Sequence, residues 1–470
     1  MTEPKPKSYP FPVRVRRALA RRFPRTRRGW NRIVATARHY LARRPAVRLH
    51  RSGATFRWLA ERVREVIRRR RETRLTVAVE ISAFWEPLTG IGWYLYRLLE
   101  HLADHEEVRI RLYGPTVVDS PDLEGPVVEI PVGPALETVM WKAPEDSLLP
   151  AGWIIRLLRW MEPLLIAADR NRVVFAPNYF LPRRFLFAGG ARVATVHDLG
   201  FRRFAWTLRR ETLADLEEKF EHAVREAGRV ISVSAAVKQE LVDYGYADPV
   251  RVRVIHHGPG QLSTVTPGQL PPGVAPPFGL FIGTIEPRKN VSTLLAAWRR
   301  LSRDGEARPP LVLCGRFGWE SDDLRAAVRQ AESEGWARHL GYVDDAELAA
   351  LLRAAEVVVF PSLYEGFGLP AVEAQWAGTP LVASDIPVLR EVTAGAAILV
   401  PPLDDEALAT AVRRVLTQPD LREDLRRRGL ERVRQLSWRR AAAETAAVWF
   451  EAAGETARES PAGTSTPNHD

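Results

Sequence analysis

The chain has 470 residues, of which 46% are hydrophobic and 27% charged, a composition typical of globular proteins. One hydrophobic core rarely grows beyond about 250–300 residues, so we expect two domains. The single cysteine, Cys314, excludes an internal disulfide and fits a reducing compartment. The start carries no secretory signal, and no apolar run reaches about 18 residues, so we expect a cytoplasmic protein without a membrane-spanning helix.

The net charge of +11 is distributed unevenly along the chain. Residues 1–74 contain 24 lysines and arginines against 4 acidic residues, a net charge of +20. The remaining residues carry a net charge of −9. The basic character therefore belongs to an N-terminal extension, and the mildly acidic remainder argues against a nucleic acid partner.

The basic N-terminal extension, residues 1–74, begins with an irregular, proline-rich stretch. Between Trp30 and Arg71, apolar residues recur every three or four positions among arginines, which predicts a basic amphipathic helix. Such helices commonly lie on anionic membrane surfaces. A solvated, disordered tail and a helix packed on the rest of the protein are the alternatives.

From Leu75 onward, short β-rich segments alternate with amphipathic helical segments. This pattern predicts strands at 75–81, 108–113, 172–176, 192–197, 229–233 and 250–255. A glycine loop at 89–92 precedes a helix that runs through about His101, and further helices are expected at 208–226 and 235–244. The alternation favours a parallel sheet with helices on both faces.

Residues 259–277 are rich in proline and glycine and are the clearest linker in the chain. The alternation then restarts, with strands expected at 278–283, 310–315, 338–343, 356–361, 379–384 and 396–400. The fold class is therefore α/β, with two doubly wound, Rossmann-like domains at 75–260 and 275–436. Residues 456–470 are expected to be a disordered tail. Open α/β sheets bind ligands beyond the carboxyl ends of their strands.

The segment Gly283–Asn290, GTIEPRKN, follows one predicted strand and opens a helix. A helix N-terminus offers free backbone N–H groups and the positive end of the helix dipole. Arg288 and Lys289 add two cations at that point, which suits a phosphate group. The alternative is an ordinary loop with two exposed cations.

The segment 361–373, PSLYEGFGLPAVE, follows another predicted strand. Gly366 and Gly368 leave backbone amides uncovered, while Glu365 lies in the loop and Glu373 about a turn into the next helix. Carboxylates accept hydrogen bonds from sugar hydroxyls, and glycine amides suit phosphate or sugar oxygens. Because helices are rich in glutamate, the two carboxylates alone would not identify a site.

Histidines at two strand ends have a more ambiguous meaning. His197 in VHDL can position a hydroxyl or transfer a proton, although a lone histidine is more often structural. The pair His256–His257 has no cysteine or carboxylate at metal-ligand spacing, so a metal site is disfavoured. Gly90 and Gly92 lack the third glycine of the dinucleotide-binding fingerprint.

Taken together, residues 75–455 resemble the group 1 (family 4) retaining glycosyltransferases of the GT-B fold. The resemblance is carried by the glycine loop at 89–92 and by segments 196–199, 231–241, 281–290, 361–374, 380–392 and 437–449. It implies two Rossmann-like domains facing a cleft, with a last helix at about 437–455 that crosses back onto the first domain. It also implies transfer of a sugar from a nucleotide-sugar donor to an acceptor hydroxyl, with retained anomeric configuration.

The resemblance also implies roles for individual residues. Lys289 matches the lysine on the donor diphosphate, and Arg288 is the candidate to replace an arginine that family members often carry at the position of Thr284. The catalytic pair is His197, which matches a histidine near the transferred sugar, and Glu365, which matches the glutamate on the donor sugar. Glu373 matches the glutamate on the ribose, and the backbone amides of Gly366, Phe367 and Gly368 would face the sugar and phosphates. Gly92 matches the loop that approaches the diphosphate.

The implied chemistry needs no cofactor or metal, because cations and a helix N-terminus can stabilise the departing diphosphate. GTIEPRKN resembles members that use GDP-mannose, so mannose is the first expectation and a UDP-sugar the second. The expected acceptor is a cell-surface polysaccharide or lipid-linked glycan, with the basic extension on the inner face of the membrane. The alternatives are a glucosyltransferase of the glycogen or sucrose type with a soluble acceptor, and a catalytically silent scaffold that binds a membrane or nucleic acid.

Overall fold

The computed structural model describes Arg64, Arg68 and residues 72–454, apart from 86–89, 115–129, 131, 140–162, 165, 179–184, 186, 208–209, 261, 263–264, 302–308 and 319–321. Most of the basic extension and the whole of the predicted tail therefore lie outside the described residues. The two sheets and their helices belong to one compact unit made of residues 70–141 and 159–470. Within the described part of the chain, no helix is both long and apolar enough to span a bilayer.

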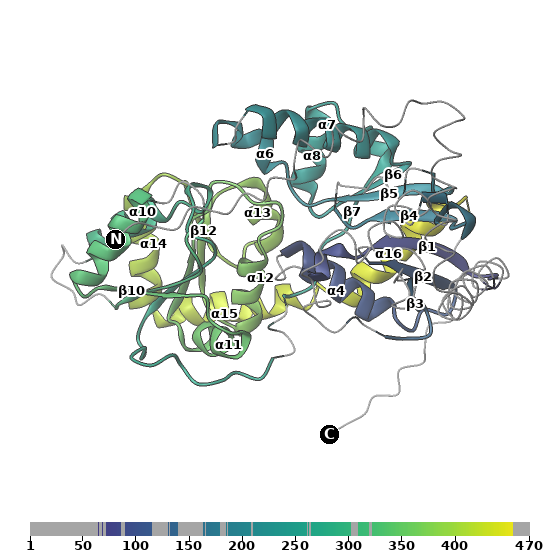
Figure 1. Ribbon diagram of the computed structural model, residues 1–470. Coiled ribbons are helices and arrows are strands. Elements are labelled where there is room, and N and C mark those ends of the chain that lie inside the picture. Colours follow the sequence, from purple (N-terminus) through teal and green to yellow (C-terminus); the bar gives the residue numbers. More distant parts are fainter. Residues whose placement is uncertain are drawn as a thin grey trace, which may run out of the picture. The chain divides into compact units, whose positions relative to one another are not determined.

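The first sheet has seven parallel strands in the order β3-β2-β1-β4-β5-β6-β7 (Figure 1). The strands are β1 (Leu75–Glu80), β2 (Val108–Tyr113), β3 (Leu136–Val139), β4 (Val173–Ala176), β5 (Ala191–Val196), β6 (Arg229–Ser232) and β7 (Val252–Val254). All six predicted strands are confirmed to within two residues at each end. The short edge strand β3 was not predicted, because LETV is too brief and too polar to stand out.

The first sheet and the helices packed on it form the first lobe. Its helical segments are η1 (Ser82–Trp85), α4 (Gly90–Leu102), α6 (Gly200–Arg203), η3 (Ala205–Thr207), α7 (Arg210–Glu226), α8 (Ala235–Asp243) and η4 (Pro249–Arg251). The prediction that Gly90 and Gly92 lie in a loop is wrong, since both belong to the first turn of α4. A glycine costs a helix only about 1 kcal/mol, which the buried leucines of α4 offset.

The second sheet has six parallel strands in the order β10-β9-β8-β11-β12-β13. They are β8 (Gly279–Ile282), β9 (Leu311–Cys314), β10 (Ala337–Gly341), β11 (Val357–Phe360), β12 (Leu381–Ser384) and β13 (Ile398–Val400), as predicted. This second lobe contains η6 (Pro287–Lys289), α9 (Val291–Leu301), α10 (Asp322–Ser333), α11 (Asp345–Ala354), α12 (Leu369–Ala377), α13 (Pro387–Thr393), α14 (Asp405–Thr417) and α15 (Pro419–Val433).

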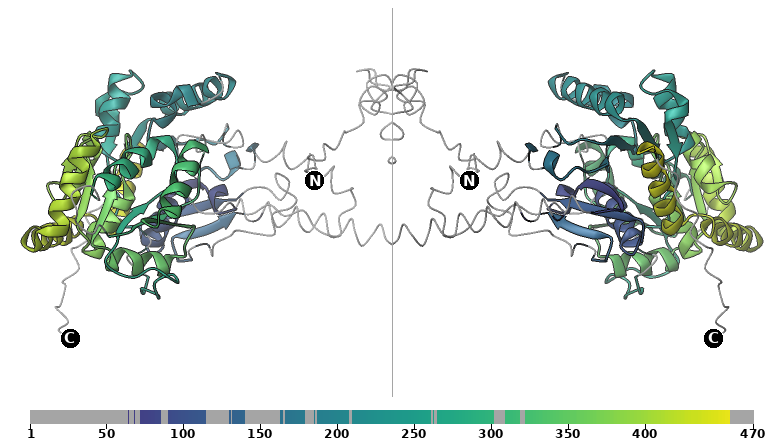
Figure 2. Two further views of the ribbon diagram at one scale, coloured as in Figure 1. Left: turned by 90° about the vertical axis from the view of Figure 1, so that its left-hand side faces the viewer. Right: turned by 90° about the vertical axis from the view of Figure 1, so that its right-hand side faces the viewer.

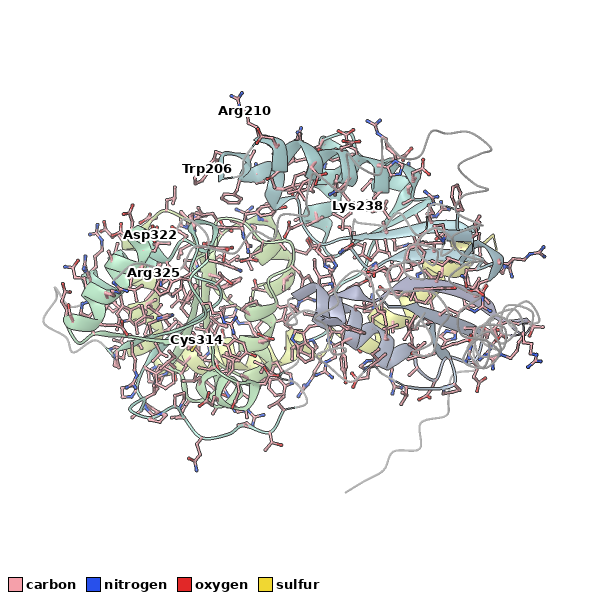
Figure 3. All side chains as sticks on the ribbon, viewed as in Figure 1. Trp206, Arg210, Lys238, Cys314, Asp322 and Arg325 are labelled. Carbon is pink, nitrogen blue, oxygen red and sulfur yellow. The ribbon has the colours of Figure 1, made fainter. Side chains whose placement is uncertain are left out.

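Helices cover both faces of each sheet because successive strand residues point to opposite sides (Figures 1 and 2). In β8, Leu280 packs with α12 and α13 residues, whereas Phe281 packs with α9 residues. Cys314 ends β9 and is 2% exposed, as predicted, and burial raises the pKa of its thiol to about 12 (Figure 3). The Rossmann-like architecture of both lobes is thus confirmed.

The last described helix, α16 (Trp438–Ala452), returns to the first lobe. It packs against α4, and its Trp449 and Phe450 join the same apolar cluster as β1 and β2. In Figure 1 this yellow helix lies beside α4 and the first sheet. The first core is therefore completed by residues from the far end of the described chain.

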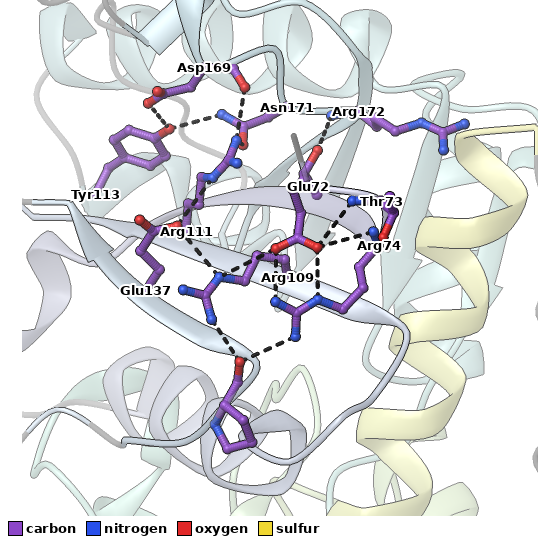
Figure 4. Close-up of polar contacts among 12 residues, drawn as sticks. Glu72, Thr73, Arg74, Arg109, Arg111, Tyr113, Glu137, Asp169, Asn171 and Arg172 are labelled. Atoms are coloured by element: carbon purple, nitrogen blue, oxygen red, sulfur yellow. Dashed lines mark hydrogen bonds and ion pairs between the residues drawn. The ribbon is translucent and has the colours of Figure 1, made fainter. Parts of the chain in front are cut away.

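The other face of the first sheet holds a buried polar network (Figure 4). The Tyr113 hydroxyl donates to Asp169 Oδ2 over 2.7 Å and accepts from Asn171 Nδ2 over 2.9 Å. Arg111 donates to the backbone oxygen of Asp169 and to Asn171 Oδ1 over 2.8 and 2.9 Å. Because each of these bonds satisfies a buried polar atom, the network fixes the segment before β4.

Candidate functional site

The candidate site is built on two loops that follow β8 and β11, which are neighbouring strands of the second sheet. The backbone N–H of Leu363 donates to the Arg288 carbonyl over 2.9 Å. The Asn290 side chain donates to the Pro361 carbonyl over 3.1 Å. These bonds hold the GTIEPRKN and PSLYEGFGLP loops together at the carboxyl edge of the sheet, where open α/β sheets bind ligands.

Lys289, Arg288 and Glu365 form a buried charge cluster between these loops. Lys289 Nζ is ion-paired with Glu365 Oε1, and Arg288 Nη1 lies 3.1 Å from Glu365 Oε2. Arg288 also contacts Glu286, whose Oε1 lies 2.9 Å from Nη2. Lys289 and Glu365 are each 7% exposed. Burial by itself would raise the pKa of Glu365, but the two cations outweigh it and hold that pKa below its ordinary value.

The cluster differs from the predicted arrangement in one respect. Arg288 and Lys289 do not lie in the first turn of α9, because they end a separate 3-10 turn, η6. Asn290 follows with a left-handed φ of 55° and reorients the chain before α9 begins. Lys289 is buried and Arg288 is half-buried, so the alternative of two exposed cations is wrong. Thr284, by contrast, is exposed.

The PSLYEGFGLP loop packs against the first lobe next to His197. A β-carbon built on Gly366 would be 1.8 Å from the His197 carbonyl oxygen, so only glycine fits there. The Gly366 carbonyl in turn accepts a hydrogen bond from Ser234 Oγ over 2.7 Å. Phe367 extends this contact, with its ring centroid 4.7 Å from that of His257. Gly368 is the N-cap of α12 and has φ 88°.

The His197 imidazole is half-buried beside α4. Its Nε2 lies 2.8 Å from the Pro177 carbonyl oxygen, and its ring packs edge-on against Tyr94 at 4.8 Å between centroids. Burial lowers the pKa of His197, which favours the neutral ring. Because a carbonyl only accepts, Nε2 carries the proton and Nδ1 is left as the hydrogen-bond acceptor.

Sequence reasoning missed Tyr364, which bridges the two lobes. Its hydroxyl accepts the backbone N–H of Leu199 over 2.7 Å and donates to Glu240 Oε2 over 2.7 Å. Nothing in the local pattern shows this bond, because Glu240 lies 124 positions earlier in the chain.

A second missed contact joins α13 to the first lobe. The Glu391 carboxylate accepts the N–H groups of Ala235 and Ala236 over 2.7 and 3.1 Å. It also lies 2.6 Å from His256 Nε2. The N-cap serine of α8, Ser234, was the available signal, since it marks a helix start with free N–H groups.

Glu373 and Gly92 lie at the margins of the cluster. Glu373 on α12 is half-buried beside the linker, where a β-carbon at Gly260 would be 1.9 Å from its Oε1. Burial raises the pKa of Glu373 to about 8. Among the described residues, no hydrogen bond or ion pair links Glu373 to Lys289 or Glu365, nor Gly92 to either. Their predicted contacts with ribose and diphosphate stay predictions.

His257 is 3% exposed and stacks on Trp438 at 5.2 Å between ring centroids. Neither of its ring nitrogens has a hydrogen-bond partner among the described residues, and burial lowers its pKa well below the ordinary value. Over all the residues that the structure describes, no group of three or more His, Cys, Asp or Glu side chains could hold a metal ion.

Comparison with known proteins gives two family matches. Residues 88–258 match the model described as Glycosyltransferase Family 4, and residues 267–432 match the model described as Glycosyl transferases group 1. The two matches follow each other along the chain and cover both lobes. Each contains the motifs of its lobe, including His197 in the first and the Lys289–Glu365 cluster in the second.

Individual relatives agree with these matches. The chain is 30% identical over 384 residues to O-antigen chain mannosyltransferase B of Escherichia coli, covering 76% of this chain and 95% of that protein. It is 32% identical over 237 residues to glycogen synthase of Mycobacterium tuberculosis, covering 49% of this chain and 55% of that enzyme.

Solved structures share the fold. Sucrose-phosphate synthase from Thermosynechococcus elongatus matches with a TM-score of 0.61 and 23% identity, covering 80% of this chain and 99% of that one. Anabaena HepE in complex with UDP and glucose matches with a TM-score of 0.58 and 15% identity, covering 80% of this chain and all of that one. These likenesses extend over both lobes.

Proposed function

The chain belongs to the group 1 (family 4) glycosyltransferases, and we propose that it transfers mannose from GDP-mannose to an acceptor hydroxyl with retention of configuration. The observation that carries this proposal is the Lys289–Glu365–Arg288 charge cluster, in which Glu365 belongs to the loop that packs against His197. The choice of mannose is supported by the GTIEPRKN motif and by the similarity to an O-antigen mannosyltransferase over most of the chain.

In the proposed reaction, the bond between the anomeric carbon and the diphosphate oxygen breaks while the acceptor oxygen attacks from the same face. The acceptor proton passes to the departing phosphate oxygen, so no protein nucleophile is needed. Negative charge grows on the diphosphate, and Lys289 and Arg288 are the cations available to stabilise it. Glu365 holds both cations in place and binds the donor sugar.

His197 supports the same step from the first lobe. Its neutral ring, fixed by the Pro177 carbonyl, offers an acceptor nitrogen to a sugar hydroxyl. Glu373 would accept the ribose hydroxyls, and the backbone amides of Gly366, Phe367 and Gly368 would face the sugar and phosphates. Contact between the lobes limits the entry of water and slows hydrolysis of the donor. Since the cations supply the needed charge, we propose that the reaction requires no metal.

We further propose a cell-surface polysaccharide or a lipid-linked glycan as the acceptor. The E. coli relative is an O-antigen chain mannosyltransferase, which supports an acceptor of this class. The basic extension, residues 1–74, would hold the enzyme on the anionic inner face of the cell membrane.

A screen of radiolabelled nucleotide sugars tests the donor. We expect turnover of GDP-mannose and none of UDP-glucose or ADP-glucose. The similarity to a glycogen synthase over half of the chain makes glucosyl transfer the second candidate, and preferential turnover of a glucose donor would establish it instead. Purified protein that binds and turns over no nucleotide sugar would point to a silent scaffold.

A further inference from the structure

Hydrogen bonds from three places in the second lobe end on α8 of the first lobe. Tyr364 donates to Glu240 within the helix, and the Gly366 carbonyl accepts from its N-cap, Ser234. From α13, Glu391 accepts the first two N–H groups of the helix. The nine-residue helix α8 is therefore hydrogen-bonded both to the PSLYEGFGLP loop, called the Glu365 loop below, and to α13.

The helix α8 is itself fixed to the first sheet. Lys238 Nζ donates to the Val252 carbonyl of β7 over 2.8 Å. Val237 and Leu241 are 1% and 0% exposed in the core beneath it. Because polar and apolar contacts both hold α8 to this sheet, a hydrogen bond from the second lobe to α8 also fixes the second lobe relative to the first sheet.

Among these contacts, the Tyr364 hydroxyl has a particular geometry. It accepts the N–H of Leu199, two positions after His197, while its own chain continues directly into Glu365. The side chain is 7% exposed, and both partners lie 2.7 Å away. One buried hydroxyl thus joins the backbone that carries His197 to the backbone that carries Glu365.

We propose that Tyr364 is a positioning residue for the glycosyl transfer, whose hydroxyl keeps the Glu365 loop in register with the strand end that bears His197. This role rests on the proposed function, because it concerns the reaction of a donor held between these residues. A displacement of about 1 Å between reacting groups can cost about a hundredfold in rate, so one such anchor matters.

The test compares Tyr364→Phe with Tyr113→Phe. Tyr113 is a matched control, since its hydroxyl is also buried, donates to a carboxylate over 2.7 Å and accepts one N–H bond. Its partners Asp169 and Asn171 both belong to the first lobe (Figure 4). Both variants lose the same chemical group from a buried site, so their melting temperatures should fall by similar amounts.

The readouts are the kcat for GDP-mannose hydrolysis without acceptor and the affinity for GDP by calorimetry. For Tyr364→Phe we expect kcat to fall about tenfold or more while GDP affinity changes less than about threefold. Tyr113→Phe should change neither by more than about twofold. Glu240→Gln keeps a side-chain oxygen that can accept the hydrogen bond from the Tyr364 hydroxyl, so its kcat should stay within about threefold of wild type.

Wild-type kcat in Tyr364→Phe, an equal loss in Tyr113→Phe, or a loss confined to GDP affinity would overturn the role of Tyr364. If the wild-type protein turns over neither GDP-mannose nor UDP-glucose, the proposed function fails and this role fails with it. Turnover by wild type together with an unaffected Tyr364→Phe variant overturns the role alone.

Discussion

Gly366 of the second lobe lies directly on the backbone carbonyl of His197 in the first lobe. A β-carbon at Gly366 would be 1.8 Å from that oxygen, far inside van der Waals contact. The two loops that carry Glu365 and His197 are therefore matched at the level of the main chain. Their approach depends on the absence of a single methyl group.

Gly366→Ala should separate these loops. Relieving the clash requires backbone movement, and we expect the free energy of unfolding to fall by about 1–3 kcal/mol together with a large loss of kcat. Gly189→Ala is the control, because nothing lies within 4 Å of a β-carbon at that position. Equilibrium denaturation and donor hydrolysis measure both effects, and equal behaviour of the two variants would contradict the contact.

Lys289→Ala should remove the cation nearest to Glu365. We expect kcat/KM for GDP-mannose to fall about 10²–10³-fold and GDP affinity to weaken, because charge is lost from the leaving group. Lys219→Ala is the matched control, since Lys219 is exposed and paired with Asp215 on α7. Its effect on unfolding should stay below about 1 kcal/mol. Unchanged turnover in Lys289→Ala would argue against a phosphate site.

Glu373→Gln should change how stability depends on pH. Burial raises the pKa of Glu373 from its ordinary value of 4.5 to about 8, so the folded protein binds a proton that the unfolded chain has lost. Stability from this group is present at low pH and declines as pH rises from about 5 to about 8. We therefore expect the variant to match wild type near pH 4 and to melt at a higher temperature above pH 8. A difference in melting temperature between variant and wild type that stays constant across this pH range would show that Glu373 is not protonated in the fold.

Deleting residues 1–72 should abolish binding to anionic liposomes while donor turnover in solution stays the same. The segment carries the excess positive charge of the chain, and its attraction to anionic lipid is weakened by salt. Co-sedimentation with phosphatidylserine vesicles at two salt concentrations measures it. Binding that persists in the shortened protein, or that ignores salt, would refute the membrane role of the extension.

The sequence predicts most of the fold because its periodicity is local. Twelve strands were found from alternating apolar segments, and the missed one, β3, is a four-residue edge strand with two polar side chains. The site loops were found by the same means, since Glu365 and Lys289 each follow a clear strand. Local patterns also identified Cys314 as a buried residue.

The contacts between the lobes could not be predicted in this way. Tyr364 and Glu240 are 124 positions apart, and Ser234 and Gly366 are 132 apart. Their pairing depends on the docking of two independently patterned sheets, which no local period encodes. The pKa of Glu373 has the same origin, because Gly260 of the linker contributes to its burial.

The return of α16 to the first sheet has a consequence for synthesis on the ribosome. Strands β1–β7 leave the ribosome long before Trp449 and Phe450, yet these two aromatic side chains belong to the apolar cluster that also contains residues of β1 and β2. The half of the enzyme that is translated first therefore cannot finish folding first, and it must wait with an incomplete apolar face until the other half has been made. A nascent chain arrested before residue 438 should accordingly recruit chaperones at its N-terminal half.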